Sequence, residues 1–251
     1  WCCATARATL RSSKADMPEL TLVQKIVVFA LPVLLAITLH EAAHGYAARW
    51  FGDHTAELAG RISVNPLRHI DPVGTVLVPL MILVVSKLLG GAGILFGWAK
   101  PVPVNFGRLR HPKKDMLWVA AAGPASNLVQ AVVWGLVIQL ALLLDDGFAS
   151  RPLLLTGAAG VFINVILMAL NLLPLPPLDG GRIAVSLLPM RQAIAFSKIE
   201  PWGMFILLGL MFSGVLSVVM WPLMQLFIGL TAFVTGLDSG RLIGLIAFVL
   251  A

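Results

Sequence analysis

Three stretches of the chain contain no Asp, Glu, Lys or Arg, and each is long enough to cross a membrane as a helix. They are residues 116–144, 152–178 and 201–237. A helix needs roughly 20 apolar residues to span the hydrocarbon core. Because lipid offers the backbone no hydrogen-bond partner, a single apolar segment of this length crosses as a helix. Charged residues make up only 12% of the chain, about half of their usual share in soluble domains. The sequence therefore predicts an all-α polytopic membrane protein.

We expect about five to six transmembrane helices, with a short re-entrant or extended segment near 73–106. Apolar spans or passages are predicted at about 23–51, 117–144, 156 to the prolines before Asp179, 202–220 and 223–250, with Pro222 between the last two. The apolar stretch 73–86 is short for a full crossing, so a re-entrant segment fits it better. A continuous span to Leu95 stays open as the alternative.

Residues 96–106 are predicted to be extended rather than helical. Pro101 and Pro103 disfavour the helical region for the residues that precede them. They also lack backbone N–H donors, so a strand formed here pairs freely along only its other edge.

The basic residues indicate a membrane side rather than a nucleic-acid surface. The net charge is +6, and much of the excess lies between apolar segments, at Lys100, Arg108, Arg110, Lys113 and Lys114. Basic loops of this kind are typical of the cytoplasmic side of a membrane, so no nucleic-acid partner is expected. The basic residues of 1–16 contradict this orientation unless Met17 is the start. We therefore expect 1–16 to be a non-native or disordered extension and 17–251 to be a single integral-membrane domain.

The residues with the clearest chemistry are His40, Glu41 and His44, which form an H-E-x-x-H motif in an apolar helix. Side chains at i and i+4 lie above one another on one helical face, so both imidazoles can reach one zinc ion. Glu41 points to the side, where it can hold a metal-bound water and take its proton. The alternative to a metal site is that these three are ordinary polar residues on a solvated helix end. However, a carboxylate between two imidazoles is costly in an apolar helix, and such groups are functional by default.

A catalytic zinc needs a third protein ligand and an open position for water, and Asp179 is the best candidate. It follows a long uncharged run in the sequence LPLPPLDGGR. Backbone broken by prolines is tolerated in a membrane only where it faces protein or a water-filled cavity, so an acid there indicates a polar interior. The histidines at 54, 69 and 111 lie in polar loops. The alternative for Asp179 is an ion pair with Arg182 at a helix end.

Together these motifs resemble the site-2 protease family of intramembrane zinc metalloproteases, peptidase family M50. The resemblance rests on HEAAH in the first apolar span, AAGPASN at 121–127 and NLLPLPPLDGGR at 171–182. The compact, membrane-only type without a PDZ or CBS domain is the most similar, since the chain has no room for either domain. The apolar stretch 73–97 and the tract 60–74 differ from the more familiar members, and they leave the topology and any role of His69 open.

The resemblance implies one zinc ion per chain, held by His40, His44 and Asp179, with Glu41 as the catalytic glutamate. It implies active-site support or substrate contact for a further set: Trp98, Val102, Val104, Asn127, Asn171, Pro174 and Pro176. The implied activity is hydrolysis of peptide bonds within or near transmembrane segments of membrane proteins or signal-peptide-like helices. We expect the protein in the lipid bilayer of a bacterial or archaeal cell, with its active site nearer the cytoplasmic face. No further cofactor and no oligomeric state are implied.

Two other functions stay open at this point. The first is a non-catalytic metal-binding membrane scaffold or transporter, although such a protein has no need of Glu41. The second is a different membrane metallopeptidase that uses a glutamate as its third ligand. Glu57 and Glu200 are the only later glutamates, and neither lies in an apolar helix.

Overall fold

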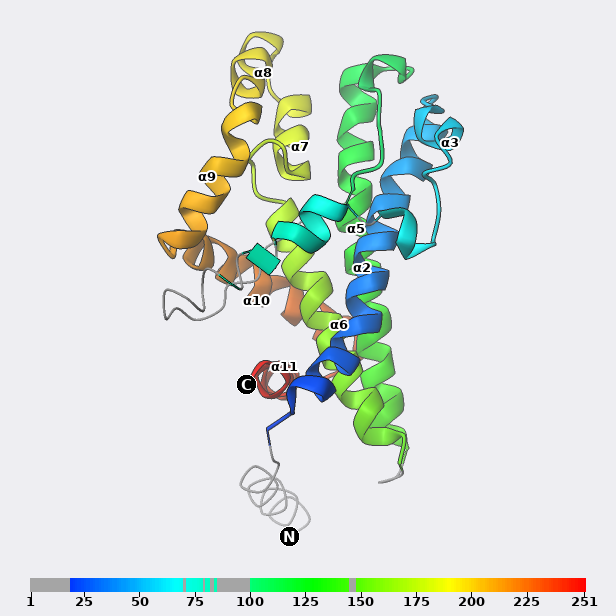
Figure 1. Ribbon diagram of the computed structural model, residues 1–251, viewed down its shortest axis with the longest axis vertical. Coiled ribbons are helices and arrows are strands. Elements are labelled where there is room, and N and C mark those ends of the chain that lie inside the picture. The colour runs from blue at the N-terminus through cyan, green and yellow to red at the C-terminus, as the bar shows by residue number, and fades with distance from the viewer. Residues whose placement is uncertain (1–18, 70, 79, 82–83, 85–99, 145–147) are drawn as a thin grey trace.

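The computed structural model describes residues 19–251 apart from 70, 79, 82–83, 85–99 and 145–147. Within these residues the fold is helical and contains no strand (Figure 1). Four of the described helices are long and apolar enough to cross a membrane: α2 (Leu22–Trp50), α5 (Pro112–Leu143), α6 (Ser150–Asn171) and α10 (Val215–Thr235). A fifth span results if α8 (Met190–Ser197) and α9 (Glu200–Phe212), which are bent by 63° relative to each other, are counted as one. The prediction of an all-α multi-pass membrane protein is confirmed.

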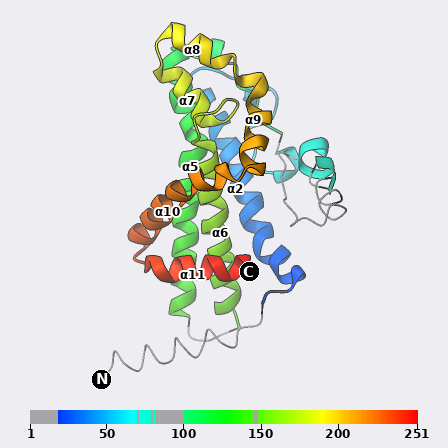
Figure 2. The same ribbon diagram turned by 90° about the vertical axis from the view of Figure 1, so that its left-hand side faces the viewer.

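Short elements connect the spans. They are α3 (Thr55–Leu58), η1 (Pro66–His69), η2 (Pro72–Leu77), η3 (Phe106–Arg108) and α7 (Asp179–Leu187). A last helix, α11 (Ser239–Leu250), packs against α6 and lies across the bundle (Figure 2).

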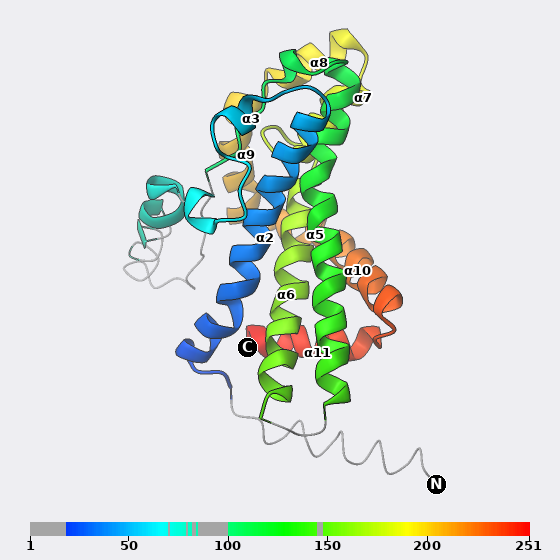
Figure 3. The same cartoon turned by 90° about the vertical axis from the view of Figure 1, so that its right-hand side faces the viewer.

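Helices α2, α5 and α6 lie side by side and form the centre of the molecule (Figure 3). Glycines on α6 allow it to approach α5 closely. A Cβ on Gly160 would lie 2.2 Å from Cγ of Trp134, and one on Gly157 would lie 2.7 Å from Cγ1 of Ile138. Small residues at helix contacts are the usual means by which membrane helices pack, since lipid removes the hydrophobic driving force between them.

The outward faces of these helices are apolar and exposed. Val27 of α2, Leu143 of α5 and Phe233 of α10 have exposed fractions of 67%, 80% and 85%. Apolar surface of this extent is unfavourable in water but is matched by the acyl chains of a bilayer. This apolar surface is therefore suited to contact with lipid rather than with water.

The connection from α6 to α7 places Asp179 at the centre of the bundle. Helix α6 ends at Asn171, and α7 begins with Asp179. A Cβ on Gly180 would lie 2.3 Å from the carbonyl oxygens of Leu172 and Leu173. Only glycine therefore lets the first turn of α7 pack onto the segment that follows α6, and this packing sets the position of the carboxylate.

The predicted boundary at Pro222 is wrong. Pro222 lies inside α10, which continues from Val215 to Thr235. The chain instead breaks at Gly214 and Gly236, whose φ angles of 76° and 72° lie in the left-handed region. A proline costs a helix one backbone hydrogen bond and bends it, whereas left-handed backbone ends it, and glycine adopts that conformation without strain.

Two predictions fall wholly or mainly on residues outside the described ones. The extension 1–16 lies entirely outside them. Of 73–97, only 73–78, 80, 81 and 84 are described, and η2 begins there, with the side chain of Asp71 accepting hydrogen bonds from Val73 and Gly74. Whether this stretch crosses or re-enters the membrane stays a prediction.

Candidate active site

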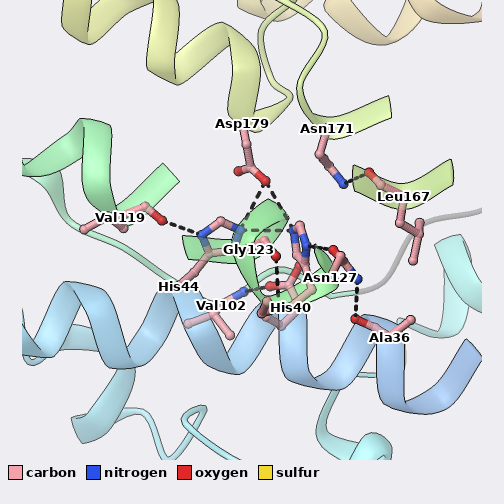
Figure 4. A network of polar contacts seen from close by, with 12 residues as sticks. Ala36, His40, His44, Val102, Val119, Gly123, Asn127, Leu167, Asn171 and Asp179 are labelled. Atoms are coloured by element: carbon pink, nitrogen blue, oxygen red, sulfur yellow. Dashed lines mark hydrogen bonds and ion pairs between the residues drawn. The ribbon is translucent and has the colours of Figure 1, made fainter. Parts of the chain in front are cut away.

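His40 and His44 lie one helical turn apart on α2 and face the start of α7 (Figure 4). Their rings meet edge to face with centroids 4.7 Å apart, and their Nε2 atoms are 3.1 Å apart. Asp179 directs Oδ2 at both rings, 3.2 Å from Nε2 of His40 and 3.3 Å from Nε2 of His44. Side chains from two segments far apart in the sequence thus meet at one largely buried point.

The other ring nitrogens fix the tautomer of each imidazole. Nδ1 of His40 is 2.6 Å from Oδ1 of Asn127, and Nδ1 of His44 is 2.7 Å from the carbonyl oxygen of Val119. The amide of Asn127 is itself oriented, because its Nδ2 donates to the Ala36 carbonyl and to Oδ1 of Asn164. Both Nδ1 atoms therefore face acceptors and carry the proton. Each Nε2 is left with a lone pair directed at the other ring and at Asp179.

This arrangement is suited to a cation. Two lone pairs and a carboxylate oxygen lie 3.1–3.3 Å from one another, and Oδ2 of Asp179 is buried without a hydrogen-bond donor in the described part of the chain. Three acceptors so close together repel one another unless a positive charge lies between them. Two ligands that are each about 2.1 Å from a tetrahedral zinc lie about 3.4 Å apart, so the donor set and its spacing fit this metal.

The alternative partner of Asp179 is not observed. Arg182 faces Glu200 at 3.8 Å and stacks over the ring of Phe106, with Cζ 4.9 Å from the ring centroid. Among the described residues, the one group of His, Cys, Asp and Glu side chains close enough to share a metal is His40, His44 and Asp179. A glutamate ligand is also not observed, because Glu57 pairs on the surface with Arg49 and His54.

Gly123 of α5 is a site residue that sequence reasoning did not single out for this purpose. A Cβ on Gly123 would lie 2.4 Å from Nε2 of His44 and 2.6 Å from Nε2 of His40. The missing side chain leaves the space that the two imidazoles occupy. The motif AAGPASN contains this glycine, but nothing in the local sequence indicates that it faces the histidines.

Glu41 is bound by the backbone of the predicted extended segment. Its Oε2 accepts a hydrogen bond from the N–H of Val102 at 2.7 Å. The side chain of Val102 is buried and lies with Ile62 over Gly45 of α2, where a Cβ would be 3.3 Å from Cγ1 of Val102. The segment 100–105 thus runs beside the face of α2 that carries Glu41.

A second carboxylate, that of Asp53, holds the other end of this segment. Its Oδ2 accepts from the N–H of Asn105 at 2.6 Å, and its Oδ1 accepts from the N–H and hydroxyl of Thr55. Burial by itself would raise the pKa of Asp53, but these hydrogen bonds and the charge of Arg108 hold the pKa below its usual range. The Asp-x-Thr spacing is a known turn signal that could have drawn attention to Asp53.

The remaining predicted residues lie around this centre in different ways. Asn127 contacts His40, as described above. Val104 packs in a small cluster with Ala48, Leu109 and Val119. Asn171 donates from Nδ2 to the Leu167 carbonyl of its own helix at 3.0 Å and not to Asp179. Pro174 and Pro176 lie in the connection between α6 and α7. Trp98 lies outside the described residues.

His69 is buried but does not belong to the group of His40, His44 and Asp179 that could share a metal. Its Nε2 is 2.9 Å from the carbonyl oxygen of Ser63, and its own carbonyl accepts from the N–H of Lys100 at 2.9 Å. It therefore belongs to the support of the extended segment.

Comparisons with known proteins find relatives that are provisionally named zinc metalloproteases. The family model of peptidase family M50 matches residues 147–214. YwhC of Bacillus subtilis, provisionally named a zinc metalloprotease, is 36% identical over 200 residues, which cover 78% of this chain and 84% of that protein. Rip2 of Mycolicibacterium smegmatis, named in the same way, is 33% identical over 186 residues, which cover 73% of this chain and 66% of that protein. No solved structure matches the chain.

Proposed function

The chain belongs to peptidase family M50, and we propose that in this intramembrane zinc metalloprotease His40, His44 and Asp179 hold the zinc and Glu41 is the catalytic base. The observation that carries the proposal is the convergence of two Nε2 lone pairs and an unpartnered carboxylate oxygen within 3.1–3.3 Å. Three protein ligands leave a fourth position for water, as in other catalytic zinc sites.

The chemistry divides between the metal and the protein. When bound, zinc supplies a Lewis acid that polarises a carbonyl and lowers the pKa of water. Glu41 takes the proton from the attacking water and delivers it to the leaving amine, so one carboxylate serves both halves of the hydrolysis. Asn127 and the Val119 carbonyl keep the imidazoles in the tautomer that presents Nε2.

The extended segment is the proposed binding place of the substrate. A peptide bond in a membrane helix is already hydrogen-bonded, so it must be unwound before attack, and a strand can replace the lost bonds. In an extended chain Val102 and Val104 direct their N–H groups to one edge, while Pro101 and Pro103 leave the other edge without donors. The N–H of Val102 lies against Glu41, so the edge that can donate is the one beside the proposed base.

We place the substrate among membrane proteins and signal-peptide-like helices, with cleavage nearer the cytoplasmic face. His44 contacts Val119 near the start of α5, and Lys113 and Lys114 lie in the first turn of that helix. Basic residues of this kind favour the cytoplasmic side. The catalytic centre would then lie toward that side of the bilayer.

Zinc quantification combined with a cleavage assay tests the proposal. The full chain in detergent micelles is expected to hold one zinc and to cleave a fluorogenic single-span peptide. Asp179→Ala should lose most of the zinc, because a ligand is removed, and Glu41→Gln should keep the zinc and lose cleavage. Full zinc in Asp179→Ala would reject the ligand set. Cleavage by Glu41→Gln would reject the base, and a wild-type chain that binds zinc without cleaving would favour the metal-binding scaffold.

A further inference from the structure

The extended segment is held in place by the loop that follows α3 and includes η1 (residues 59–69), as well as by α2. The N–H of Lys100 donates to the carbonyl of His69 at 2.9 Å. Further along, the N–H groups of Val102 and Asn105 donate to the carboxylates of Glu41 and Asp53. The extended segment is therefore bound both by the helix that carries the proposed base and by a loop whose described residues make no hydrogen bond to the proposed metal ligands.

Arg61 is the residue of this loop whose side chain donates hydrogen bonds to the extended segment. Its Nη2 donates to the carbonyls of Lys100 at 2.9 Å and Pro101 at 3.3 Å. Its Nη1 donates to the carbonyl of Arg68 within the loop. A planar guanidinium with several donors can serve three carbonyls at once, which a lysine ammonium on a flexible stem does less well.

Arg61 contacts the two residues that directly precede Val102, the residue whose N–H binds Glu41. Pro101 has no N–H, so its carbonyl is the only backbone hydrogen-bonding group by which it can be fixed. By fixing that carbonyl, Arg61 sets the peptide plane that contains the N–H of Val102. The same N–H donates to Oε2 of Glu41 at 2.7 Å. The position of the strand relative to the base thus depends on a residue in a different loop.

We propose that Arg61 is a positioning residue. It holds residues 100–102 so that the edge of the extended segment that carries the Val102 N–H stays against Glu41. This inference rests on the proposed function for the meaning of the strand, but the contacts themselves do not depend on it. Loss of Arg61 should loosen the strand and weaken substrate binding while leaving the metal ligands untouched.

Arg68 offers a matched control in the same loop. Its Nη1 donates to the carbonyl of Gly60, and its side chain makes no hydrogen bond to the described residues of the extended segment. Replacement of either arginine removes the same charge from the same surface. A difference between the two variants therefore reports the contact with the strand and not the charge.

The first measurement needs no substrate. Between Lys100 and Phe106 only Val102, Val104 and Asn105 carry a backbone N–H, because the other two residues are prolines. Hydrogen–deuterium exchange of this peptide in the full, zinc-loaded chain should be about tenfold faster in Arg61→Ala, since charged donors to two carbonyls are lost. Arg61→Lys should fall between Arg61→Ala and wild type, and Arg68→Ala should match wild type.

The second measurement separates positioning from a general structural role. With the fluorogenic single-span peptide, Arg61→Ala should raise KM or lower kcat/KM about tenfold, with the zinc content unchanged and partial rescue in Arg61→Lys. Exchange and kinetics like those of Arg68→Ala would overturn the proposal. Loss of zinc in both Arg61 variants would also overturn it, because Arg61 would then support the whole fold. If the wild type does not cleave, the proposed function fails, while the exchange measurement still decides whether Arg61 holds the strand.

Discussion

Gly123 on α5 faces His44 on α2 so closely that a single methyl group in its place would lie 2.4 Å from Nε2 of the imidazole. The second imidazole, that of His40, is almost as near. The geometry of the proposed metal ligands therefore depends on the absence of a side chain on α5 as well as on the side chains that α2 provides. Helix contact and metal binding depend on the same residue.

Gly123→Ala is expected to lose most of the bound zinc. The added Cβ must displace at least one imidazole from the position in which its Nδ1 meets an acceptor. Zinc content per chain measures the effect. Gly229→Ala on α10 is the control, because a Cβ there meets nothing within 4 Å, and it should keep zinc and be as stable as wild type or slightly more stable. Full zinc in Gly123→Ala would show that the imidazoles have room to move.

Asn127→Ala is expected to weaken zinc binding about 10–100-fold, the usual effect of removing a partner of a ligating histidine. The variant removes the acceptor at 2.6 Å from Nδ1 of His40 and frees that ring to rotate or change tautomer. Competition with a chromogenic chelator gives the affinity. Asn171→Ala removes an amide that bonds within its own helix and should leave the affinity unchanged. Equal affinities in the two variants would show that Asn127 does not orient His40.

The candidate ligand side chains could be predicted from the sequence because each of them lies in a short motif. The spacing of His40 and His44 defines a helical face, and the prolines before Asp179 indicate a broken helix with a polar side chain. Each of these signals needs only neighbours in the chain. The sequence indicates Asp179 as the partner of the histidines through its chemical setting and the family resemblance, but no local rule fixes how α2 and α7 approach each other.

The residues that sequence reasoning missed act through contacts between segments far apart in the chain. Asp53 and Arg61 look like ordinary loop charges until the fold brings Asn105 and Lys100 beside them. The predicted helix boundary at Pro222 is wrong for a related reason. A proline in the sequence indicates a possible break, but packing decides whether the helix continues through it, and here the glycines at 214 and 236 end the helices instead.

Removal of the metal is expected to destabilise the wild-type chain and to have little effect on Asp179→Ala. Without a cation, three acceptors face one another at 3.1–3.3 Å. A ligand present at 100 to 1,000 times its Kd stabilises the folded state by about 3–4 kcal/mol. A chelator should therefore lower the thermal midpoint of the wild type by several degrees, and added zinc should restore it. An equal response in Asp179→Ala would mean that the stabilising metal binds elsewhere.

Asp53 is expected to make the stability of the chain decline in acid. Its pKa is lower in the folded chain than the usual value of about 3.9, so the unfolded chain takes up the proton at a higher pH. The stabilisation by Asp53 is therefore complete above about pH 5 and is lost as the pH falls through the folded pKa.

Asp53→Asn should be less stable than wild type at pH 7 by about 1–2 kcal/mol, because an amide is a weaker acceptor for the N–H of Asn105. This difference in thermal midpoint should shrink between pH 5 and pH 3.5, since the unfolded wild-type chain then takes up a proton on Asp53 and is stabilised relative to the folded chain. Asp238→Asn alters a helix cap at α11 that accepts from the N–H of Arg241, and asparagine caps about as well as aspartate. Its midpoint should follow that of wild type across the same range, and a constant gap between wild type and Asp53→Asn would show that the charge of Asp53 does not stabilise the end of the strand.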